Sequence, residues 1–401
     1  MNKIAWILKF SLILIVAAFG PAGIGKAKAQ QPIKIGYLSS LSGPFTPWGI
    51  LVRDGMKLAV AEVNAAGGVA GRPLELVERD DRNNPSEAVT AFQYMIERED
   101  VVAVGGIISS DVGLAVSREA EVRKVPLFLT MSGSDAILTK ESRYTFRTCL
   151  PAAPMNMGYI AGLIQERKYT RIGAIVADYA WGHAINDAID ASVKPLEGVK
   201  LQIEAAPVSE RDFTPYLRKL LDLNPELLIA TGHPPGSVTI ARQAIELGMG
   251  AQVIGPWFPT AFTVERAGEQ IFGRFVDYTC SDFDSPDYQR LAEKFHAASN
   301  HLLDINGISG YAIVKILAQT IMDKKSTDPK VIADAVHTGR FVIPGYGWPL
   351  SYTEWGEMKE AAPILYTYEK GSPPEGVNPG ANWRTKVVFR SKPVQPYVPG
   401  K

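Results

Sequence analysis

The chain has 401 residues, of which 46% are hydrophobic, and its 42 basic residues balance its 42 acidic ones. This neutrality gives no support for binding to nucleic acid or to an anionic membrane surface. The two cysteines, Cys149 and Cys280, are too few for a disulfide framework and lack metal-ligand spacing. Two alternatives remain for them, a disulfide with each other or two buried thiols.

The first residues have the pattern of a secretion signal. Lys3 and Lys9 supply positive charge, residues 10–19 are apolar, and the Ala-Lys-Ala of residues 27–29 is a small-x-small cleavage pattern. The apolar stretch is shorter than the roughly 20 residues that a membrane-spanning helix needs. No Cys follows it that could carry a lipid anchor. We therefore expect residues 1–29 to be a cleaved signal peptide and the mature protein to be soluble in the periplasm.

From residue 33 onward, short β-branched runs alternate with amphipathic stretches, which is typical of parallel sheets flanked by helices. The predicted strands of the first half cover residues 33–38, 74–78, 101–107 and 126–130. The predicted helices between them cover residues 52–63, 86–98 and 109–123. The mature chain is longer than one hydrophobic core usually serves, so we expect two domains.

The alternation restarts after residue 151, which predicts a second lobe of similar build. Its predicted strands cover residues 171–178, 201–208, 227–231 and 252–255. Its predicted helices cover residues 182–193, 214–221 and 238–247. Residues 275–282 are expected to carry the chain back, because two helical stretches follow that need a sheet to cover, residues 287–298 and 307–322. From residue 344 we expect short strands and irregular structure.

The loops after the predicted strands carry the candidate site, because ligands of open α/β sheets bind beyond the carboxyl ends of the strands. Four hydroxyls gather there, on Ser109, Ser110, Ser132 and Ser134. A serine at a helix N-terminus offers its hydroxyl and backbone N–H groups, and the helix dipole favours an anion. Each serine alone is explained as a helix cap, but two pairs after successive strands favour an anion site.

Large ring side chains occupy other loops of the same kind, namely Trp48, Trp181, His233 and Trp257. Core packing is the alternative for the three tryptophans, and helix capping is the alternative for His233. Loops that open helices usually run over the surface, however, which favours a ligand-lining role. The predicted ligand therefore has one anionic end and one apolar end.

Several short stretches resemble the type I periplasmic binding proteins that serve branched-chain amino acid ABC importers. The stretches are Ile33-Lys34-Ile35-Gly36, Leu41-Ser42-Gly43-Pro44, residues 65–71 (AAGGVAG), Arg79-Asp80-Asp81 with Pro85, Phe146-Arg147-Thr148, Asp178 with Trp181-Gly182, Asp212-Phe213 and Gly255-Pro256. The resemblance covers nearly the whole mature chain, and it is carried by the order and spacing of these stretches. It implies two Rossmann-like α/β lobes, each a parallel sheet flanked by helices, joined by three crossovers and closing on one ligand.

The resemblance also implies a division of the chain and a function. The first lobe would be residues 32–148 plus 282–342, and the second would be residues 149–281 plus 343–401. The protein would be a monomeric receptor without a cofactor or catalysis, and it would deliver a small molecule to ABC permease subunits in the membrane. Both cysteines would lie near crossovers, so a disulfide between them is sterically conceivable and is left open.

Site roles are implied residue by residue. Ser109 and Ser110 resemble the loop that receives the ligand's carboxylate, with Ser132 and Ser134 in the next loop. Two aromatic residues fall where the family covers the ligand from either lobe, Trp48 and Trp181. His233 falls where the family often has an aromatic hydroxyl.

Trp257 departs from the family pattern. The residue after the Gly-Pro pair is typically an acid that pairs with the ammonium group of an amino acid, and here it is an indole. A buried ammonium without a counter-charge costs several kcal/mol. The sequence therefore favours a carboxylate without an amine, for example an aromatic acid. A branched-chain amino acid or an amide is the alternative, since Asp111 or Asp178 offers a charge in place of the missing acid.

Two other function classes were weighed. The chain has no nucleophile elbow, no Walker loop and no His-Glu-x-x-His motif, and its five histidines lack metal spacing, so an enzyme is disfavoured. A ligand sensor that docks on a membrane regulator would use the same two lobes as a transport receptor. Nothing in the sequence separates these last two roles.

Overall fold

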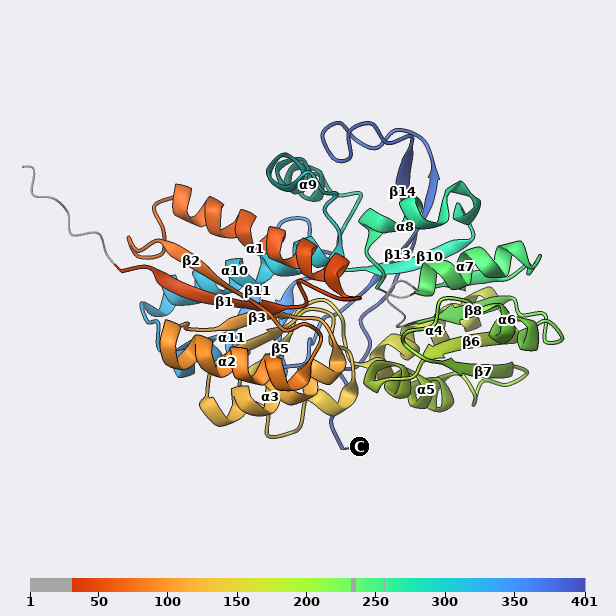
Figure 1. Cartoon of the computed structure of the whole chain (residues 1–401), viewed down its shortest axis with the longest axis horizontal. Helices are drawn as coiled ribbons and strands as arrows, with labels where there is room; N and C mark the ends of the chain where they lie inside the picture. The colour runs from red at the N-terminus through yellow and green to blue at the C-terminus, as the bar shows by residue number, and fades with distance from the viewer. Residues whose placement is uncertain (1–30, 232–235, 256, 401) are drawn as a thin grey trace, which may run out of the picture.

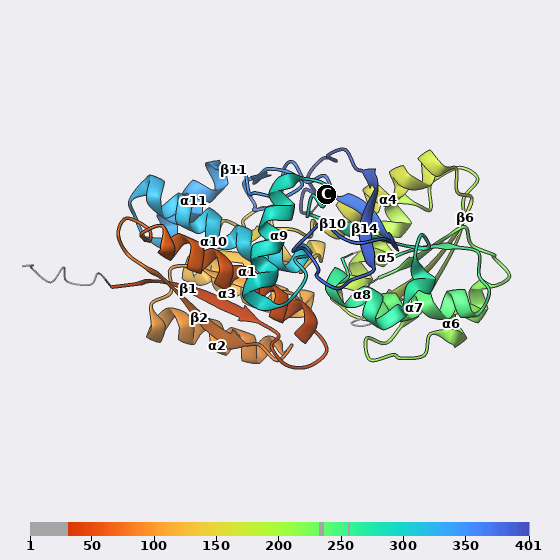
Figure 2. The same ribbon diagram turned by 90° about the horizontal axis from the view of Figure 1, so that it is seen from above.

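The computed structural model describes residues 31–231, 236–255 and 257–400, which form two α/β lobes side by side (Figure 1). The predicted signal peptide lies outside the described residues. A view turned by 90° also separates the lobes, with α1, α2 and α11 in one and α5, α6 and α7 in the other (Figure 2). Within the described part, no helix combines the length and hydropathy that crossing a membrane requires.

The first lobe is built on a five-stranded parallel sheet of order β2-β1-β3-β4-β5. Its strands are β1 (Ile33–Ser39), β2 (Leu74–Asp80), β3 (Val104–Ile107), β4 (Leu127–Leu129) and β5 (Thr145–Arg147). Its helices are α1 (Thr46–Ala65), α2 (Pro85–Glu99), α3 (Ser110–Arg123), α9 (Pro286–Ser299), α10 (Ile305–Lys324) and α11 (Pro329–Thr338), with a short 3₁₀ helix η1 (Asp135–Ile137). Helices α1 and α10 pack together on one face, and α2 and α3 on the other (Figure 1). Because both faces are covered, β3 and β4 are buried along their whole length.

Capping side chains set where several of these helices begin. The Asn84 side chain accepts hydrogen bonds from the backbone of Ser86 and Glu87 at the start of α2. Asp304 and Asp328 cap α10 and α11 in the same way. These caps satisfy N–H groups that have no partner inside the helix.

The second lobe is built on a seven-stranded sheet of order β14-β13-β10-β9-β8-β6-β7. Its strands are β6 (Arg171–Ala177), β7 (Lys200–Ala206), β8 (Leu227–Ala230), β9 (Gln252–Ile254), β10 (Phe275–Thr279), β13 (Ile364–Lys370) and β14 (Trp383–Arg390). Its helices are α4 (Ala153–Arg167), α5 (Ala180–Ser192), α6 (Thr214–Leu220), α7 (Gly236–Glu246) and α8 (Thr260–Ala267), with the 3₁₀ helix η2 (Glu269–Ile271). Strands β6 to β10 are parallel, whereas β13 and β14 join as an antiparallel hairpin.

The predicted α/β fold is confirmed, and every predicted strand overlaps an observed one. The sequence reading missed β5 and three helices, α4, α8 and α11. From residue 344 the sequence predicted only short strands and irregular structure. The structure has two regular strands there, β13 of 7 residues and β14 of 8 residues. In β14 half-buried and exposed residues alternate strictly, which is the period of a sheet strand with one solvated face.

The lobes are joined where the chain leaves β5, where it leaves β10, and between a short ribbon, β11 (Arg340–Phe341) with β12 (Leu350–Ser351), and β13. Cys149 and Cys280 form a disulfide between the first two connections, with a Cα–Cα distance of 5.8 Å. The turn of the ribbon, between β11 and β12, is bonded to both, because the Gly347 N–H donates to the Cys280 carbonyl at 2.7 Å. The Tyr346 hydroxyl donates to the Thr148 carbonyl. The first two connections and the ribbon are thus bonded together. Of the two alternatives for the cysteines, the structure shows the disulfide.

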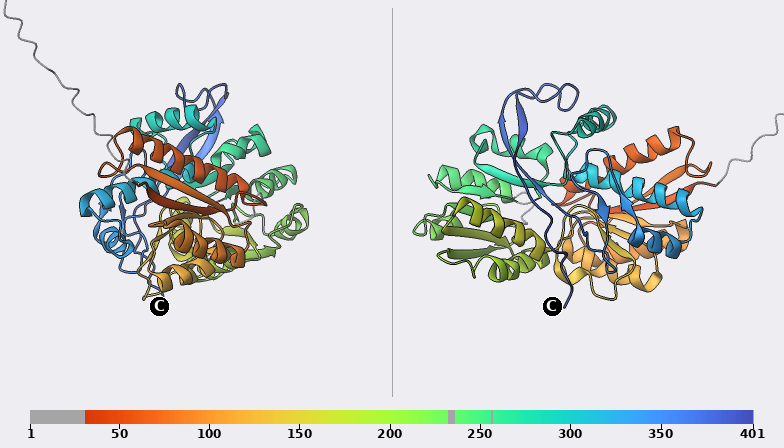
Figure 3. Two further views of the ribbon diagram at one scale, coloured as in Figure 1. Left: turned by 60° about the vertical axis from the view of Figure 1, so that its left-hand side comes forward. Right: turned by 180° about the vertical axis from the view of Figure 1, so that it is seen from behind.

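The segment after β12 packs on the first sheet. The Arg147 N–H donates to the Gly356 carbonyl at 3.1 Å. Gly356 has φ +87, and a Cβ there would lie 1.8 Å from the Thr145 carbonyl oxygen, so only glycine fits against β5. The predicted lobe boundaries stay a prediction, and we propose one change to them, that residues 350–361 group with the first lobe. Farther on, the segment after β14 runs along the junction of the lobes to the C-terminus (Figure 3).

Candidate ligand-binding site

The loops after β1, β3 and β4 meet the loops after β6 and β9 where the two lobes touch. The Trp48 indole N–H donates to the Trp257 carbonyl oxygen at 3.3 Å. A Cβ built on Gly133 would lie 2.1 Å from the ring of Trp181, so the first lobe approaches that ring with bare backbone. The predicted site residues from both lobes therefore lie at one junction.

The four predicted serines form one buried cluster. The Ser134 N–H donates to the Ser110 hydroxyl oxygen at 3.2 Å, which links the loops after β3 and β4. The Ser132 hydroxyl donates to the carbonyl oxygens of Ser109, at 3.1 Å, and Ile107, at 3.3 Å. Ser109 is the N-cap residue of α3, but its hydroxyl makes no capping hydrogen bond.

The serines are not equivalent as donors. The hydroxyl hydrogen of Ser132 is engaged within the loop, so this residue holds the loop in shape. Among the described residues, the hydroxyl hydrogens of Ser109, Ser110 and Ser134 have no acceptor. Three hydroxyl donors and the first N–H groups of α3 are therefore available together, as an anion requires.

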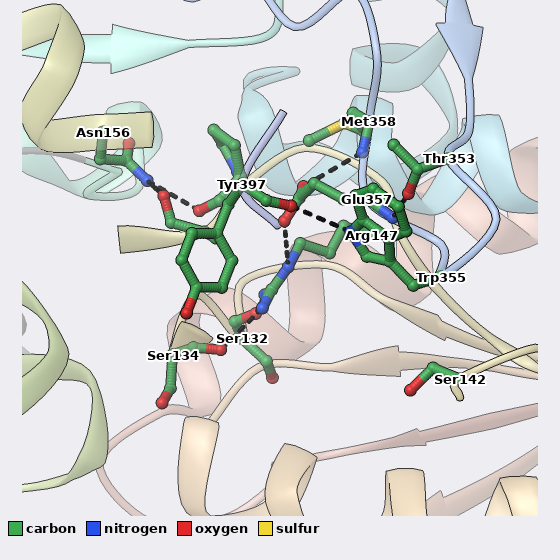
Figure 4. A network of polar contacts seen from close by, with 12 residues as sticks. Ser132, Ser134, Ser142, Arg147, Asn156, Thr353, Trp355, Glu357, Met358 and Tyr397 are labelled. Carbon is green, nitrogen blue, oxygen red and sulfur yellow. Dashed lines mark hydrogen bonds and ion pairs between the residues drawn. The ribbon is translucent and has the colours of Figure 1, made fainter. Parts of the chain in front are cut away.

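A buried ion pair lies behind the serine loop. Arg147 donates from Nη2 to the Ser134 carbonyl at 2.6 Å, from Nη1 to the Ser132 carbonyl, and from Nε to Glu357 at 3.0 Å (Figure 4). Burial lowers the pKa of the Arg147 guanidinium and raises the pKa of the Glu357 carboxyl, and the pairing opposes both shifts. The guanidinium stays charged, because arginine does not deprotonate in proteins. The serine loop is thus fixed from inside by a permanent cation.

Aromatic rings cover the serine cluster from the side of the second lobe. Trp181 is buried, and its indole N–H donates to Thr231 at 2.8 Å. Phe258 packs edge-on against Trp48, with ring centroids 5.3 Å apart. Tyr179 faces Phe45 at 6.4 Å, so a further ring from each lobe meets at the junction. The sequence reading missed Phe45, Tyr179 and Phe258, although each lies within three residues of a predicted site tryptophan.

Trp257 is anchored inside the second lobe. Its indole N–H donates to Asn156 at 2.7 Å, and its ring stacks on Tyr278 with centroids 5.7 Å apart. Its backbone has φ +71, a region rare for a bulky residue. Its own N–H donates to Asp277 at 2.5 Å, which helps to hold this conformation. Trp257 can thus offer a ring face to a ligand but no free N–H.

Asp277 lies beneath the loop after β9 and is fully buried. Its carboxylate accepts hydrogen bonds from the backbone N–H groups of Trp257, Phe258 and Tyr278. Burial raises the pKa of Asp277, and these hydrogen bonds oppose that shift. Both carboxylate oxygens are therefore occupied by backbone. Asp277 was not predicted, because nothing in its strand marks it as a loop anchor.

The remaining candidate residues fall in three places. His233 lies outside the described residues. Asp178 is 64% exposed in its side chain and contacts His183 at 2.7 Å. Asp111 is exposed in the first turn of α3, and its charge reinforces the rise that burial causes in the pKa of Tyr179. Of the two acids proposed to replace the missing one, Asp111 is the one whose charge acts on the pKa of an aromatic residue of the junction.

A separate hollow of about 540 Å³ lies between α9 and the β13–β14 hairpin. Its charged lining groups are already paired, since Lys386 and Arg384 both contact Glu369, and Asp284 contacts Arg390. It offers no unpaired group for a ligand comparable with the serine cluster. Among the described residues, no group of three or more His, Cys, Asp or Glu side chains could hold a metal ion.

Comparison with known proteins gives consistent matches over most of the chain. A family model described as periplasmic binding protein matches residues 32–365. The leucine-, isoleucine-, valine-, threonine- and alanine-binding protein of Pseudomonas aeruginosa is 25% identical over 361 residues, covering 89% of this chain and 95% of that protein.

Solved structures share the fold at lower identity. A leucine-binding protein from Thermotoga maritima superposes with a TM-score of 0.77 at 20% identity, covering 90% of this chain and 99% of that one. An ABC transporter solute-binding protein from R. palustris, in complex with benzoate, gives 0.78 at 18% identity, covering 92% and 98%.

Proposed function

The chain belongs to the periplasmic binding protein family, and we propose that it binds a small carboxylate without an amine, such as an aromatic acid, between its two lobes. It is a periplasmic solute-binding protein of an ABC transporter, and its family consists of receptors rather than enzymes. One observation carries the ligand proposal. Three serine hydroxyls of the first lobe have no hydrogen-bond acceptor among the described residues, and aromatic rings of the second lobe lie across the junction from them.

The anionic end of the ligand is assigned to the serine cluster. Ser109, Ser110 and Ser134 supply hydroxyl donors, and the N-terminus of α3 supplies N–H groups. Neutral donors suffice for a carboxylate at a helix N-terminus, because the aligned peptide dipoles contribute positive potential there.

The other end of the ligand is assigned to the rings of Trp48, Trp181 and Phe258. An ammonium group here would need an acid without another partner. Both carboxylate oxygens of the buried Asp277 already accept hydrogen bonds from backbone N–H groups. Asp178 is exposed beside His183. Asp111, near Tyr179, keeps a branched-chain amino acid as the second candidate.

The known ligands of similar proteins support both candidates. The Pseudomonas aeruginosa relative is named for leucine, isoleucine and valine, and the R. palustris structure contains benzoate. The fold therefore accepts either class, and the side chains of the site decide between them.

A thermal-shift screen of the mature protein tests the proposal. A ligand that binds the folded state raises the melting temperature by mass action. Benzoate, 4-hydroxybenzoate and 3-phenylpropanoate are expected to raise it, while leucine and valine leave it unchanged. A shift with leucine alone would replace the proposed ligand class by the branched-chain amino acids.

We also propose that the membrane partners of this protein are ABC permease subunits. We expect an exported monomer that docks on ABC permease subunits, after removal of residues 1–29. Affinity capture from membrane fractions distinguishes this role from a sensor, because a transport receptor recovers permease chains and a sensor recovers a membrane regulator.

A further inference from the structure

Arg147 binds two carbonyl oxygens of the serine loop, those of Ser132 and Ser134. The Gly133 carbonyl between them accepts from the N–H of Ala153, the first residue of α4, at 2.9 Å. In a trans peptide, the C=O and the following N–H point to opposite sides. The N–H groups of Gly133 and Asp135 are therefore turned away from Arg147, and the Ser134 N–H is turned away from α4.

The Ser134 N–H reaches the Ser110 hydroxyl oxygen and so points into the serine cluster, where the anionic end of the ligand is proposed to bind. Within the described part of the chain, the N–H groups of Gly133 and Asp135 have no hydrogen-bond acceptor. The loop thus presents backbone donors beside the serine hydroxyls.

Only a guanidinium suits this position behind the loop. Its planar fork binds two carbonyls and a carboxylate at once, which the single ammonium of a lysine does not match. A buried cation also requires a counter-charge, which Glu357 supplies at 3.0 Å. Glu357 is held in turn, because its carboxylate accepts from the Met358 N–H at 3.1 Å and its own N–H donates to Thr353 at 3.0 Å.

We propose that Arg147, neutralised by Glu357, is a positioning residue that turns the 132–133 and 134–135 peptides so that the N–H groups of Gly133 and Asp135 face the carboxylate of the ligand. The inference rests on the proposed function and assigns the anionic end of the ligand to the first lobe.

The second lobe has the inverse arrangement. Asp277 draws the N–H groups of Trp257 and Phe258 inward. The Trp257 carbonyl consequently points toward the first lobe, where it accepts from Trp48. A buried guanidinium behind one loop and a buried carboxyl group behind the other give the two sides opposite hydrogen-bonding character, donors on the first and an acceptor on the second.

The test compares acid affinity with fold stability in three variants. Arg147→Met combined with Glu357→Gln removes both charges at similar volume, which a buried pair tolerates better than loss of one partner. Arg147→Lys keeps the charge without the fork. Arg274→Met is the matched control, because Arg274 also binds two carbonyls, those of Met249 at 2.6 Å and Ala251 at 3.1 Å, in a part of the second lobe away from the serine loop.

Binding of benzoate and 3-phenylpropanoate is measured by calorimetry, and stability by urea unfolding. Both Arg147 variants are expected to bind the acids about ten- to hundredfold more weakly, the worth of one charge-assisted hydrogen bond. Arg274→Met should lose stability and keep its affinity. If Arg147→Lys recovers both stability and affinity, Arg147 is merely structural and the inference fails.

The proposed function fails separately. If the parent protein binds neither acid, the ligand proposal is wrong and the inference falls with it. If the parent binds an acid and the double variant binds it equally well, only the role of Arg147 is wrong.

Discussion

Trp48 of the first lobe donates its indole N–H to the backbone carbonyl of Trp257 in the second lobe, at 3.3 Å. The two residues are 209 positions apart in the chain, so this hydrogen bond ties the lobes together at the proposed site. The Trp257 carbonyl points toward Trp48 because the N–H of the same peptide, that of Phe258, donates to Asp277 on the opposite side. The hydrogen bond forms only while the two lobes touch. Removing it therefore tests whether this contact between the lobes contributes to ligand affinity.

Replacing Trp48 by Phe is expected to weaken ligand binding about two- to tenfold. The ring would still pack against Phe258, but a neutral hydrogen bond worth about 0.5–1.5 kcal/mol would be lost. Calorimetry gives the affinity, and Tyr169→Phe is the control, because it removes a neutral hydrogen bond of 3.0 Å to Gln252, the first residue of β9. Equal affinities in the two variants would contradict a role for Trp48 in closure.

Ser110 and Ser132 are expected to respond differently to substitution by Ala. Ser110 keeps a free hydroxyl hydrogen, so Ser110→Ala should cost about 1–3 kcal/mol of affinity for a carboxylate with little loss of stability. Ser132 spends its hydrogen on Ser109, so Ser132→Ala should lower the free energy of unfolding as well. Calorimetry combined with urea unfolding separates the two. An unchanged affinity in Ser110→Ala would remove this residue from the site.

The disulfide is expected to stabilise the junction of the lobes. Cys149 and Cys280 are 131 residues apart and both are buried. Replacing both by Ala should lower the free energy of unfolding by about 2–5 kcal/mol, since the long loop is no longer closed in the unfolded chain. Reductant should destabilise the parent and leave the double variant unchanged. A parent that keeps its stability once free thiols are detected would refute the prediction.

Stability is expected to fall in acid, partly through Asp80. Burial alone would raise the pKa of Asp80, but hydrogen bonds from Ser42, Arg82 and Leu41 outweigh it and lower the pKa. A carboxyl with a lowered pKa stabilises the fold above its unfolded pKa of about 4, and this contribution disappears as the pH falls through the folded pKa.

Asp80→Asn should therefore be less stable than the parent at pH 7, by no more than about 2 kcal/mol because the carboxylate is partly exposed. The difference should vanish toward pH 2. Urea unfolding across this range measures it. A difference that persists at pH 2 would show that the charge of Asp80 is not its cause.

The order of strands and helices followed from local patterns, and the structure confirms it. Ser109, Ser110, Ser132 and Ser134 converge because the ends of neighbouring parallel strands meet at one edge of the sheet. Pattern reasoning could therefore find this cluster. It could not assign Ser132 its inward hydrogen bond, which depends on the rotation of one hydroxyl.

The buried residues that hold the binding loops from inside, Glu357 and Asp277, could not be predicted from the sequence. Glu357 is 210 residues from Arg147 and comes from a segment for which the sequence predicted only short strands and irregular structure. Asp277 sits within a buried strand, where local pattern offers no reason for a carboxylate. Trp257 was predicted as a wall of the site, but its indole N–H is bound to Asn156, a contact between residues 101 positions apart.

The proposed site accepts a carboxylate and, among the described residues, has no buried acid free for an ammonium group. The most direct measurement is a calorimetric titration with 4-methylpentanoate and L-leucine, which differ only by the α-amino group. We expect 4-methylpentanoate to bind at least about tenfold more tightly, since burying an ammonium without a partner costs more than about 1.4 kcal/mol. Tighter binding of L-leucine would contradict it and would point to Asp111 as the acid that receives the amine.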